Sequence, residues 1–318
     1  MGKARRWQGV TMTGNEVIQT TSVTPARVRL FQPSQRPTRR DGEWIATSWG
    51  RCRVHGRLGQ RHADLVEALL YSAERRRDED AGTIKLLIDP ARVRKVMSAE
   101  RYSVQQIWKL LRELRECTVE IDTAKTRVMG GVVESAEYTK KETRADPLSG
   151  EQRRLWTIRL GKAWAELMRL DLPLHYDPAP IARLDHGISQ AVARHILTHK
   201  AEPRGGWTLD GLIDVVAGKI SSADRRNARR RLRADAAGLE AAGIEIDGDR
   251  AHRLGVSHPP RATTQTVPQP PDGVSHPPDI VPQPPGACHT RPGPLGLSGS
   301  LEPEQAALAA AQAQAQPP

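Results

Sequence analysis

Apolar residues at helical spacing predict a helix near residue 230. Between Ser221 and Leu239, alanine and leucine recur at steps of three or four residues, which is typical of a helix with one narrow buried face. Ser221 and Asp224 have the spacing of a capping box, and Gly243 suits the left-handed turn that ends a helix. We therefore expect one helix over 221–239.

The residues around this helix complete a recognisable order of elements. After it, residues 243–246 alternate as in a strand, Asp247-Gly248-Asp249 is a tight-turn signal, and residues 250–254 can return as a second strand. Before it, two segments have helical periodicity, 188–199 and 209–216, the second with Thr208 as its N-cap candidate. Three helices followed by a hairpin predict a winged helix of roughly 70 residues.

A similar order is expected over 41–140. The pattern predicts an extended segment over 44–54 and a helix over 62–74. A strand over 84–88 follows, and then two helices over 91–97 and 104–117. The helix over 104–117 begins after Ser103 and has a clear apolar face. Residues 118–123 and 131–137, with a turn near Lys125, predict a second wing.

These patterns predict an α+β, mostly helical fold with two tandem winged-helix domains. Pro147 and Gly150 in a stretch without periodicity predict a linker, after which a strand over 155–160 and a helix over 162–170 lead into the second domain. We expect a flexible basic arm over 1–40, a first winged-helix domain over 41–140 and a linker over 141–152. A second winged-helix domain over 153–254 and a disordered tail over 255–318 follow.

The tail has a composition of its own. It is rich in proline, repeats the segments GVSHPP and VPQPP, and ends in alternating alanine and glutamine. Such sequence cannot bury enough apolar surface to offset the entropy of ordering it. We interpret it as a spacer, with a docking segment for an aromatic groove as the alternative.

Charge narrows the class of partner. Lys and Arg total 48 against 37 Asp and Glu, giving a formal net charge of +11 and a pI of about 10.0, which favours nucleic acid or an anionic membrane. No segment approaches the roughly 18 consecutive apolar residues of a spanning helix, and no apolar signal region follows the basic N-terminus. We expect a cytoplasmic protein with no membrane partner. Cys52, Cys117 and Cys288 are scattered singly, which predicts reduced thiols.

The helix over 221–239 is the main candidate for contact with double-stranded DNA. In a winged helix the third helix enters the major groove, where arginine can donate two hydrogen bonds to guanine, and the wing touches phosphates. By helical spacing, Arg226, Arg230 and Arg233 face solvent, and Arg225 and Arg231 lie nearer the buried edge. The candidate DNA-binding residues here are Arg225, Arg226, Asn227, Arg229, Arg230, Arg231, Arg233, Arg250 and Arg253. The alternative is a solvated charged helix.

The first domain offers a second set of DNA-binding candidates. On the helix over 104–117, four polar residues point away from the apolar face, and two basic residues lie in the predicted wing: Gln105, Gln106, Lys109, Arg112, Lys125 and Arg127. Glu113 and Glu116 also lie on this helix, so an equally favoured interpretation is that it packs on a partner subunit.

No catalytic, cofactor or metal site is expected. The chain lacks the Gly-rich loop ending in Gly-Lys-Ser/Thr that binds nucleotide phosphates, and it has no His-x-His sequence for the metal site of a rolling-circle initiator. His195 and His199 have the spacing of two ligands on one helix face, but Ile196 replaces the glutamate of the metalloprotease motif, so the pair is interpreted as structural.

The chain resembles the plasmid replication initiators built from two winged helices, the Rep or TrfA-type family. The resemblance covers roughly 40–254 in layout. Locally it rests on Trp49-Gly50-Arg51 and the GRLGQRH entry over 56–62 before the helix ADLVEALL, and on RRNARRRL over 225–232. It implies binding to origin direct repeats (iterons), opening of an adjacent AT-rich region, and repression of the protein's own promoter. The implied partners are the host initiator, the helicase and its loader, and a second copy bound through the first winged helix.

Two other classes of function remain open. A winged-helix transcriptional repressor without an initiator role would use the same module, and a second, non-identical winged helix favours the initiator. A scaffold that binds RNA or a membrane is more distant, because RNA readers interleave aromatic residues for stacking and this chain has one phenylalanine, Phe31.

Overall fold

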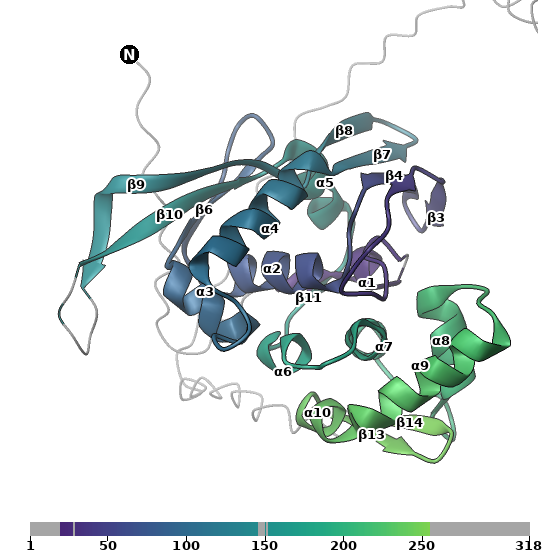
Figure 1. Ribbon diagram of the computed structural model, residues 1–318. Coiled ribbons are helices and arrows are strands. Elements are labelled where there is room, and N and C mark those ends of the chain that lie inside the picture. The colour runs from purple at the N-terminus through teal and green to yellow at the C-terminus, as the bar shows by residue number, and fades with distance from the viewer. Residues whose placement is uncertain (1–19, 28, 146–149, 151, 255–318) are drawn as a thin grey trace, which may run out of the picture. The chain divides into compact units, whose positions relative to one another are not determined.

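Helices and strands alternate along most of the chain in the computed structural model, which describes residues 20–27, 29–145, 150 and 152–254 (Figure 1). The described residues all belong to one unit, which extends to Pro259. The fold is mixed α and β with several sheets, so the expectation of a mostly helical chain is not clearly confirmed. The predicted tail, residues 1–19 of the predicted arm and Cys288 lie outside the described residues.

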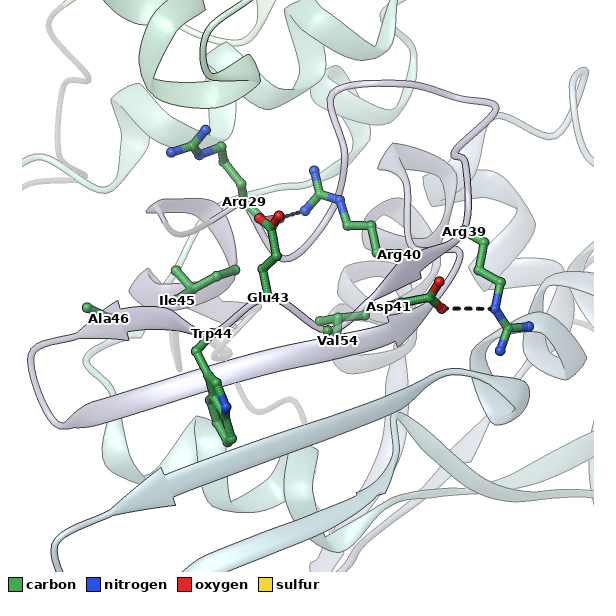
Figure 2. A pocket seen from close by; sticks show the side chains of 10 residues that line it. Arg29, Arg39, Arg40, Asp41, Glu43, Trp44, Ile45, Ala46 and Val54 are labelled. Atoms are coloured by element: carbon green, nitrogen blue, oxygen red, sulfur yellow. Dashed lines mark hydrogen bonds and ion pairs between the residues drawn. The ribbon is translucent and has the colours of Figure 1, made fainter. Parts of the chain in front are cut away.

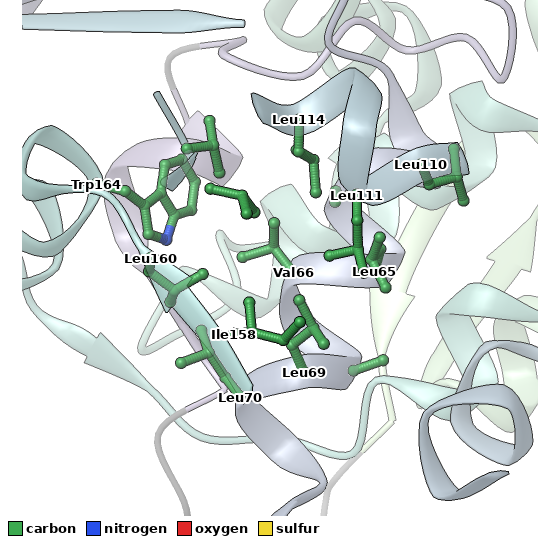
Figure 3. Packing of buried hydrophobic residues seen from close by; sticks show 14 of the residues in the cluster. Leu65, Val66, Leu69, Leu70, Leu110, Leu111, Leu114, Ile158, Leu160 and Trp164 are labelled. Atoms are coloured by element: carbon green, nitrogen blue, oxygen red, sulfur yellow. The ribbon is translucent and has the colours of Figure 1, made fainter. Parts of the chain in front are cut away.

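The first and larger apolar cluster is built from residues between Leu30 and Met168. Its elements are β2 (Arg40–Asp41), β3 (Ile45–Thr47), β4 (Gly50–Gly56), α2 (Gln60–Tyr71), β5 (Ala73–Asp78), β6 (Ile84–Ile88), α3 (Pro90–Met97), α4 (Val104–Glu116), β7 (Thr118–Thr123), β8 (Arg127–Gly131), β9 (Val133–Ala145), β10 (Gln152–Leu160) and α5 (Lys162–Leu170). Helices α2 and α4 pack their leucines against Ile158, Leu160 and Trp164 of β10 and α5 (Figure 3). This core is what fixes the exposed face of α4.

Two sheets belong to this cluster. One has the strand order β5-β6-β10-β9, and the other joins β2, β4, β7 and β8, with β3 also paired to β4. A short pairing of β1 (Thr21–Ser22), which precedes α1 (Val23–Arg27), with β11 (Pro173–Leu174) ties the start of the described chain to the segment after α5.

The second apolar cluster contains residues from Ile181 to Ala251. Its elements are α6 (Ala179–Ala182), α7 (Gly187–Leu197), β12 (Trp207–Thr208), α8 (Leu209–Ala217), α9 (Ser222–Ala234), α10 (Ala236–Ala241), β13 (Ile244–Asp247) and β14 (Arg250–Arg253). The predicted hairpin over 243–254 is confirmed as β13 and β14. The sequence did not predict β12, which pairs with β14 and gives a sheet of order β12-β14-β13.

The helix expected over 221–239 is two helices. It breaks at Asp235, whose backbone has φ −91° and ψ 11° and whose side chain is buried. The Asp235 carboxylate accepts a hydrogen bond of 3.0 Å from the backbone N–H of His186, the residue that precedes α7. Since a buried carboxylate needs such a partner, this long-range contact sets the end of α9.

The predicted second wing differs from the observed strands. Residues 118–123 pair with 127–131 as β7 and β8, in the sheet that contains β4, whereas 133–145 form β9 and pair with β10. Trp156 and Ile158 of β10, and Trp164 of α5, are buried in the first cluster, so these elements do not lead into the second one. Residues 141–145 and 152 of the predicted linker lie in β9 and β10. The pairing of β10 with β6 is long-range, which is why local pattern did not reveal it.

Part of the predicted flexible arm is built into the first cluster. Leu30 and Phe31 are buried, and the Phe31 ring meets Trp164 edge-on with their centres 5.8 Å apart. The backbone N–H of Gln32 donates to the carbonyl of Leu58 at 2.8 Å. The expectation of a mobile arm is therefore wrong for residues 20–40, apart from Val28, which is not described.

A buried ion network joins α2 to α7, and thus the two clusters. The Arg194 side chain is 3% exposed and donates to Glu67 at 2.8 Å, to Asp64 at 2.6 Å and to Gln60 at 2.7 Å. Gln190 donates to the second Asp64 oxygen at 3.1 Å. Burial raises the pKa of Asp64, and Arg194 opposes that rise. One guanidinium therefore holds two buried carboxylates from the other cluster.

His195 predicts a pH dependence of stability. Burial, then the nearby charges of His199 and Arg27, lower its pKa from 6.5 to about 4. Between these values the unfolded chain binds a proton that the folded chain does not, so stability should fall as pH drops from about 6.5 to about 4. Urea unfolding at both ends of this window should show a smaller loss for His195→Gln than for the parent. Equal losses in the two proteins would remove His195 as the cause.

Candidate nucleic-acid interface

Helix α9 is anchored along one face and open along the other. At its start, Ser221 Oγ accepts a hydrogen bond from the backbone N–H of Asp224 at 3.1 Å, which confirms half of the predicted capping box. The other half differs, because the Asp224 carboxylate accepts from Ser221 Oγ at 2.7 Å and not from the Ser221 backbone N–H. Ala228 and Leu232 are buried against α7 and α8. Because Ala228 and Leu232 occupy the inner face, the arginines of α9 are directed outwards or towards the flanks of the helix.

Three of the six arginines in this run form ion pairs on the flanks. Arg225 donates to both oxygens of Asp214 on α8, at 2.9 and 2.6 Å. Arg229 pairs in the same bidentate manner with Asp210, also on α8, and its Nε lies 2.7 Å from the carboxylate. These hydrogen bonds raise the pKa values of Arg225 and Arg229. Bidentate pairs of this kind hold the side chains in place.

Arg233 forms the third pair and connects α9 to the hairpin that follows. Its Nη2 lies 2.6 Å from a carboxylate oxygen of Asp249, in the turn between β13 and β14. Sequence spacing placed Arg233 on the open face, and the structure leaves it exposed but paired. This ion pair therefore helps to hold the β13–β14 hairpin next to α9.

Four other side chains on α9 are exposed and unpaired. Arg226, Asn227, Arg230 and Arg231 make no side-chain hydrogen bond or ion pair with any residue that the structure describes. The prediction that Arg226 and Arg230 face solvent is confirmed, whereas Arg231, expected nearer the buried edge, is exposed as well. These donors are free to meet an external acceptor.

The two arginines of the hairpin bond to backbone carbonyls. Arg250 donates to the carbonyl of Gly205, and Arg253 donates to that of His199 at 2.8 Å. These contacts tie β14 to the segment between α7 and β12. Each guanidinium keeps further N–H groups, because it has five and these bonds use one.

In the first cluster, the α4 candidates lie where the pattern placed them. Gln105, Gln106, Lys109 and Arg112 are all exposed. The side chain of Gln106, however, accepts from the backbone N–H of Ser103 at 2.6 Å, and thus completes a capping box at the start of α4. Gln106 is therefore engaged in holding the helix end.

Lys125 and Arg127 lie in a hairpin that follows α4 and turns near Lys125, as expected, but its second strand is β8 and it belongs to the sheet that contains β4. Arg127 Nε lies 2.6 Å from the carboxylate of Glu120, which also accepts from Arg53 at 2.5 Å. The hydrogen bond from Arg53 is the main reason that the pKa of Glu120 is lowered. Arg127 is thus bound within the sheet.

Sequence reasoning missed an aromatic and arginine cluster on this sheet. The guanidinium carbons of Arg51 and Arg53 each lie 4.5 Å from the ring centre of Trp44. The alternation of Arg51 and Arg53 with buried Cys52 along β4 was a signal for one outward basic face. Beside this cluster, Trp44 and Arg40 line a cavity of about 610 Å³ (Figure 2).

The described residues were also compared with what a membrane-spanning helix and a metal site require. None of the described helices has the length and apolar character needed to cross a membrane. Within the same residues, no group of three or more histidine, cysteine or acidic side chains is placed to hold a metal ion.

Comparison with known proteins finds similarity in structure alone. No family model matches the sequence, and no curated protein matches it. A crystal structure of selenomethionine derivatives of domains 2 and 3 of RctB has a TM-score of 0.46 at 12% identity, and the match covers 73% of this chain and 90% of that chain. A second crystal structure of RctB domains 2-3 has a TM-score of 0.40 at 11% identity, with coverages of 70% and 84%. Similarities at this level assign no family.

Proposed function

We propose that the chain is a sequence-specific double-stranded DNA-binding protein that reads the major groove with α9. The observation that carries this proposal is the set of unpaired donors Arg226, Asn227, Arg230 and Arg231 on a helix whose other face is buried. Arginine can donate two hydrogen bonds to guanine O6 and N7, and asparagine can pair with the edge of adenine. Because Leu232 anchors the helix, the backbone positions from which these side chains extend are fixed relative to one another.

The order of elements supports two winged helices in tandem. In the second cluster the order is α7, β12, α8, α9, β13 and β14, with α10 inserted after α9, and the sheet order is β12-β14-β13. The first cluster has the same order of elements: α2, β6, α3, α4, β9 and β10. Strand β5 is inserted after α2, and β7 and β8 are inserted after α4. The three corresponding strands are paired in the order β6-β10-β9. In both cases a third helix is followed by a hairpin whose last strand is central, which is the layout of a module that inserts this helix into the groove.

We extend the proposal to a role in plasmid replication. The resemblance to the tandem winged-helix initiators supports binding to iterons at an origin, repression of the protein's own promoter, and control of plasmid copy number. The proposed partners are the host initiator, helicase and helicase loader, with self-association through the first winged helix. We assign the chain no catalytic role and no cofactor, and leave strand separation by ATP hydrolysis to host enzymes. A winged-helix repressor is the alternative.

The unpaired arginines give the first test. Arg226→Ala or Arg230→Ala should each cost about 1–3 kcal/mol of binding free energy and relax base preference at one position. The measurement is selection of bound duplexes from a random-sequence library, followed by fluorescence anisotropy on the selected sequence. Arg75→Ala, an exposed arginine on β5, is the matched control and should leave both readouts unchanged. If both α9 variants bind the selected sequence as tightly as the parent, α9 is not the reading element.

The arrangement of the bound sites separates initiator from repressor. Footprinting on the DNA that flanks the gene should show direct repeats with a spacing of about two helical turns beside an AT-rich stretch if the protein is an initiator. A single inverted repeat over a promoter would favour the repressor. Loss of plasmid maintenance on deletion of the gene, restored by the intact chain and not by Arg230→Ala, would support the initiator role.

A further inference from the structure

A second group of arginines surrounds a cavity of about 470 Å³ at the start of α2, remote in sequence from α9. Arg36, Arg39, Arg57 and Arg61 line this cavity, and Glu113 and Glu116 of α4 are the acidic residues that line it with them. Four positive charges therefore face two negative ones. Such an excess around a concave site favours an anionic ligand.

The arginines of this cavity are short of acceptors. Within the described residues, the side chains of Arg36, Arg57 and Arg61 make no hydrogen bond or ion pair, while Arg39 pairs with exposed Asp41 at 3.3 Å. Among the described residues, the Nε of Arg61 is buried without a hydrogen-bond partner. An unpaired buried donor costs free energy, so a shift of this side chain that brings its N–H to an incoming acceptor would recover that cost.

The nearby His62 does not add to the charge. The backbone N–H of Gly59 donates to His62 Nδ1 at 3.1 Å, so the ring hydrogen lies on Nε2, which is 2.9 Å from Glu113. Burial lowers the pKa of His62, which favours the neutral ring, and the bond to Glu113 opposes this shift. Glu113 already accepts this hydrogen bond, which leaves it less available to the arginines.

The loop that carries Arg36 is held in one shape. The side-chain amide of Gln32 donates to the carbonyl of Thr38 at 2.6 Å and accepts from its N–H at 3.2 Å, closing the loop. The carbonyl of Ser34 accepts from the backbone N–H of Gln60 at 3.0 Å, which fixes the loop to the first residue of α2. The backbone that carries Arg36 is therefore ordered before binding, and only its side chain has to be ordered by a ligand.

We propose that Arg36, Arg57 and Arg61 form a phosphate-binding site that holds the DNA backbone while α9 reads the bases. This inference rests on the proposed function. Guanidinium groups match the geometry of phosphate oxygens, and the described residues that line the cavity include no tryptophan, tyrosine or phenylalanine on which a base could stack. The site is therefore suited to the backbone, which carries no sequence information, and the contact adds affinity without specificity.

Salt dependence of DNA binding tests this site. In anisotropy titrations, Arg57→Gln/Arg61→Gln should reduce the slope of log affinity against log salt by about 1.8, since each phosphate contact contributes about 0.9. The base preference of the selected sequence should not change. Arg57→Lys/Arg61→Lys keeps the charge and should keep most of the slope, which separates loss of contact from loss of folding. Arg75→Gln/Arg183→Gln removes two exposed arginines elsewhere and should leave the slope unchanged.

The outcomes are distinguishable. A parent protein that binds DNA, with the same slope in the Gln variant, would overturn the site and leave the proposed function standing. A parent that selects no duplex at all would overturn both. If millimolar inorganic phosphate raises the melting temperature of the parent and not of the Gln variant, while the slopes agree, the site takes free phosphate and the assignment to DNA is wrong.

Discussion

Arg194→Ala should destabilise the protein by about 3–5 kcal/mol, because it removes one partner of a buried ion network. Asp64 and Glu67 would stay in the interior with no cation, and Asp64 is fully buried. Tyr176, whose hydroxyl donates to Glu67 at 2.7 Å, cannot supply the missing charge. Equilibrium unfolding in urea measures the loss directly.

Two further variants make this expectation specific. Arg183→Ala removes an exposed arginine that precedes α7 and should change the free energy of unfolding by at most about 0.5 kcal/mol. Replacing Arg194, Asp64 and Glu67 together with apolar residues of similar volume should recover part of the lost stability, because no uncompensated charge remains. Recovery should be incomplete, because Gln60, Gln190 and Tyr176 lose hydrogen-bond partners. A loss below about 1 kcal/mol for Arg194→Ala would mean that water or a rearrangement satisfies the two carboxylates.

Leu232→Ala has the second large expected effect, a loss of about 2–5 kcal/mol from a fully buried position on α9. The cavity would loosen the helix whose outer face carries Arg226 and Arg230, so affinity for the selected DNA should fall although no DNA-facing residue has changed. Urea unfolding and anisotropy on the same samples measure both effects. Leu232→Met, which nearly conserves volume, should cost less than about 1.5 kcal/mol. A stable Leu232→Ala with normal affinity would show that α9 does not depend on this anchor.

Elements with strong local signals were predictable from the sequence. The caps at Ser103, Ser221 and Thr208 mark helices that begin where the sequence predicts. The β13–β14 hairpin follows from its Asp-Gly turn. In each case the atoms that decide the structure lie within a few residues of one another, so the pattern contains the information.

Features set by distant contacts were not predictable in this way. The end of α9 depends on a bond between Asp235 and His186, which are 49 residues apart, and the Arg194–Asp64 pair spans 130 residues. The same reason limits the candidate site. Helical spacing identified the outward face of α9. It did not reveal that Arg229 pairs with Asp210, which lies on α8 and 19 residues earlier in the chain.

The Arg194 network also bears on how freely the two halves of the chain can be exchanged during evolution. A half that contains α2 carries two interior carboxylates, and a half that contains α7 carries the cation that they require. Recombination that joined either half to an unrelated partner would inherit an unmatched charge. The two halves therefore form a matched set at this network, whereas the exposed side chains of α9 take no part in it and can change without unpairing a buried charge.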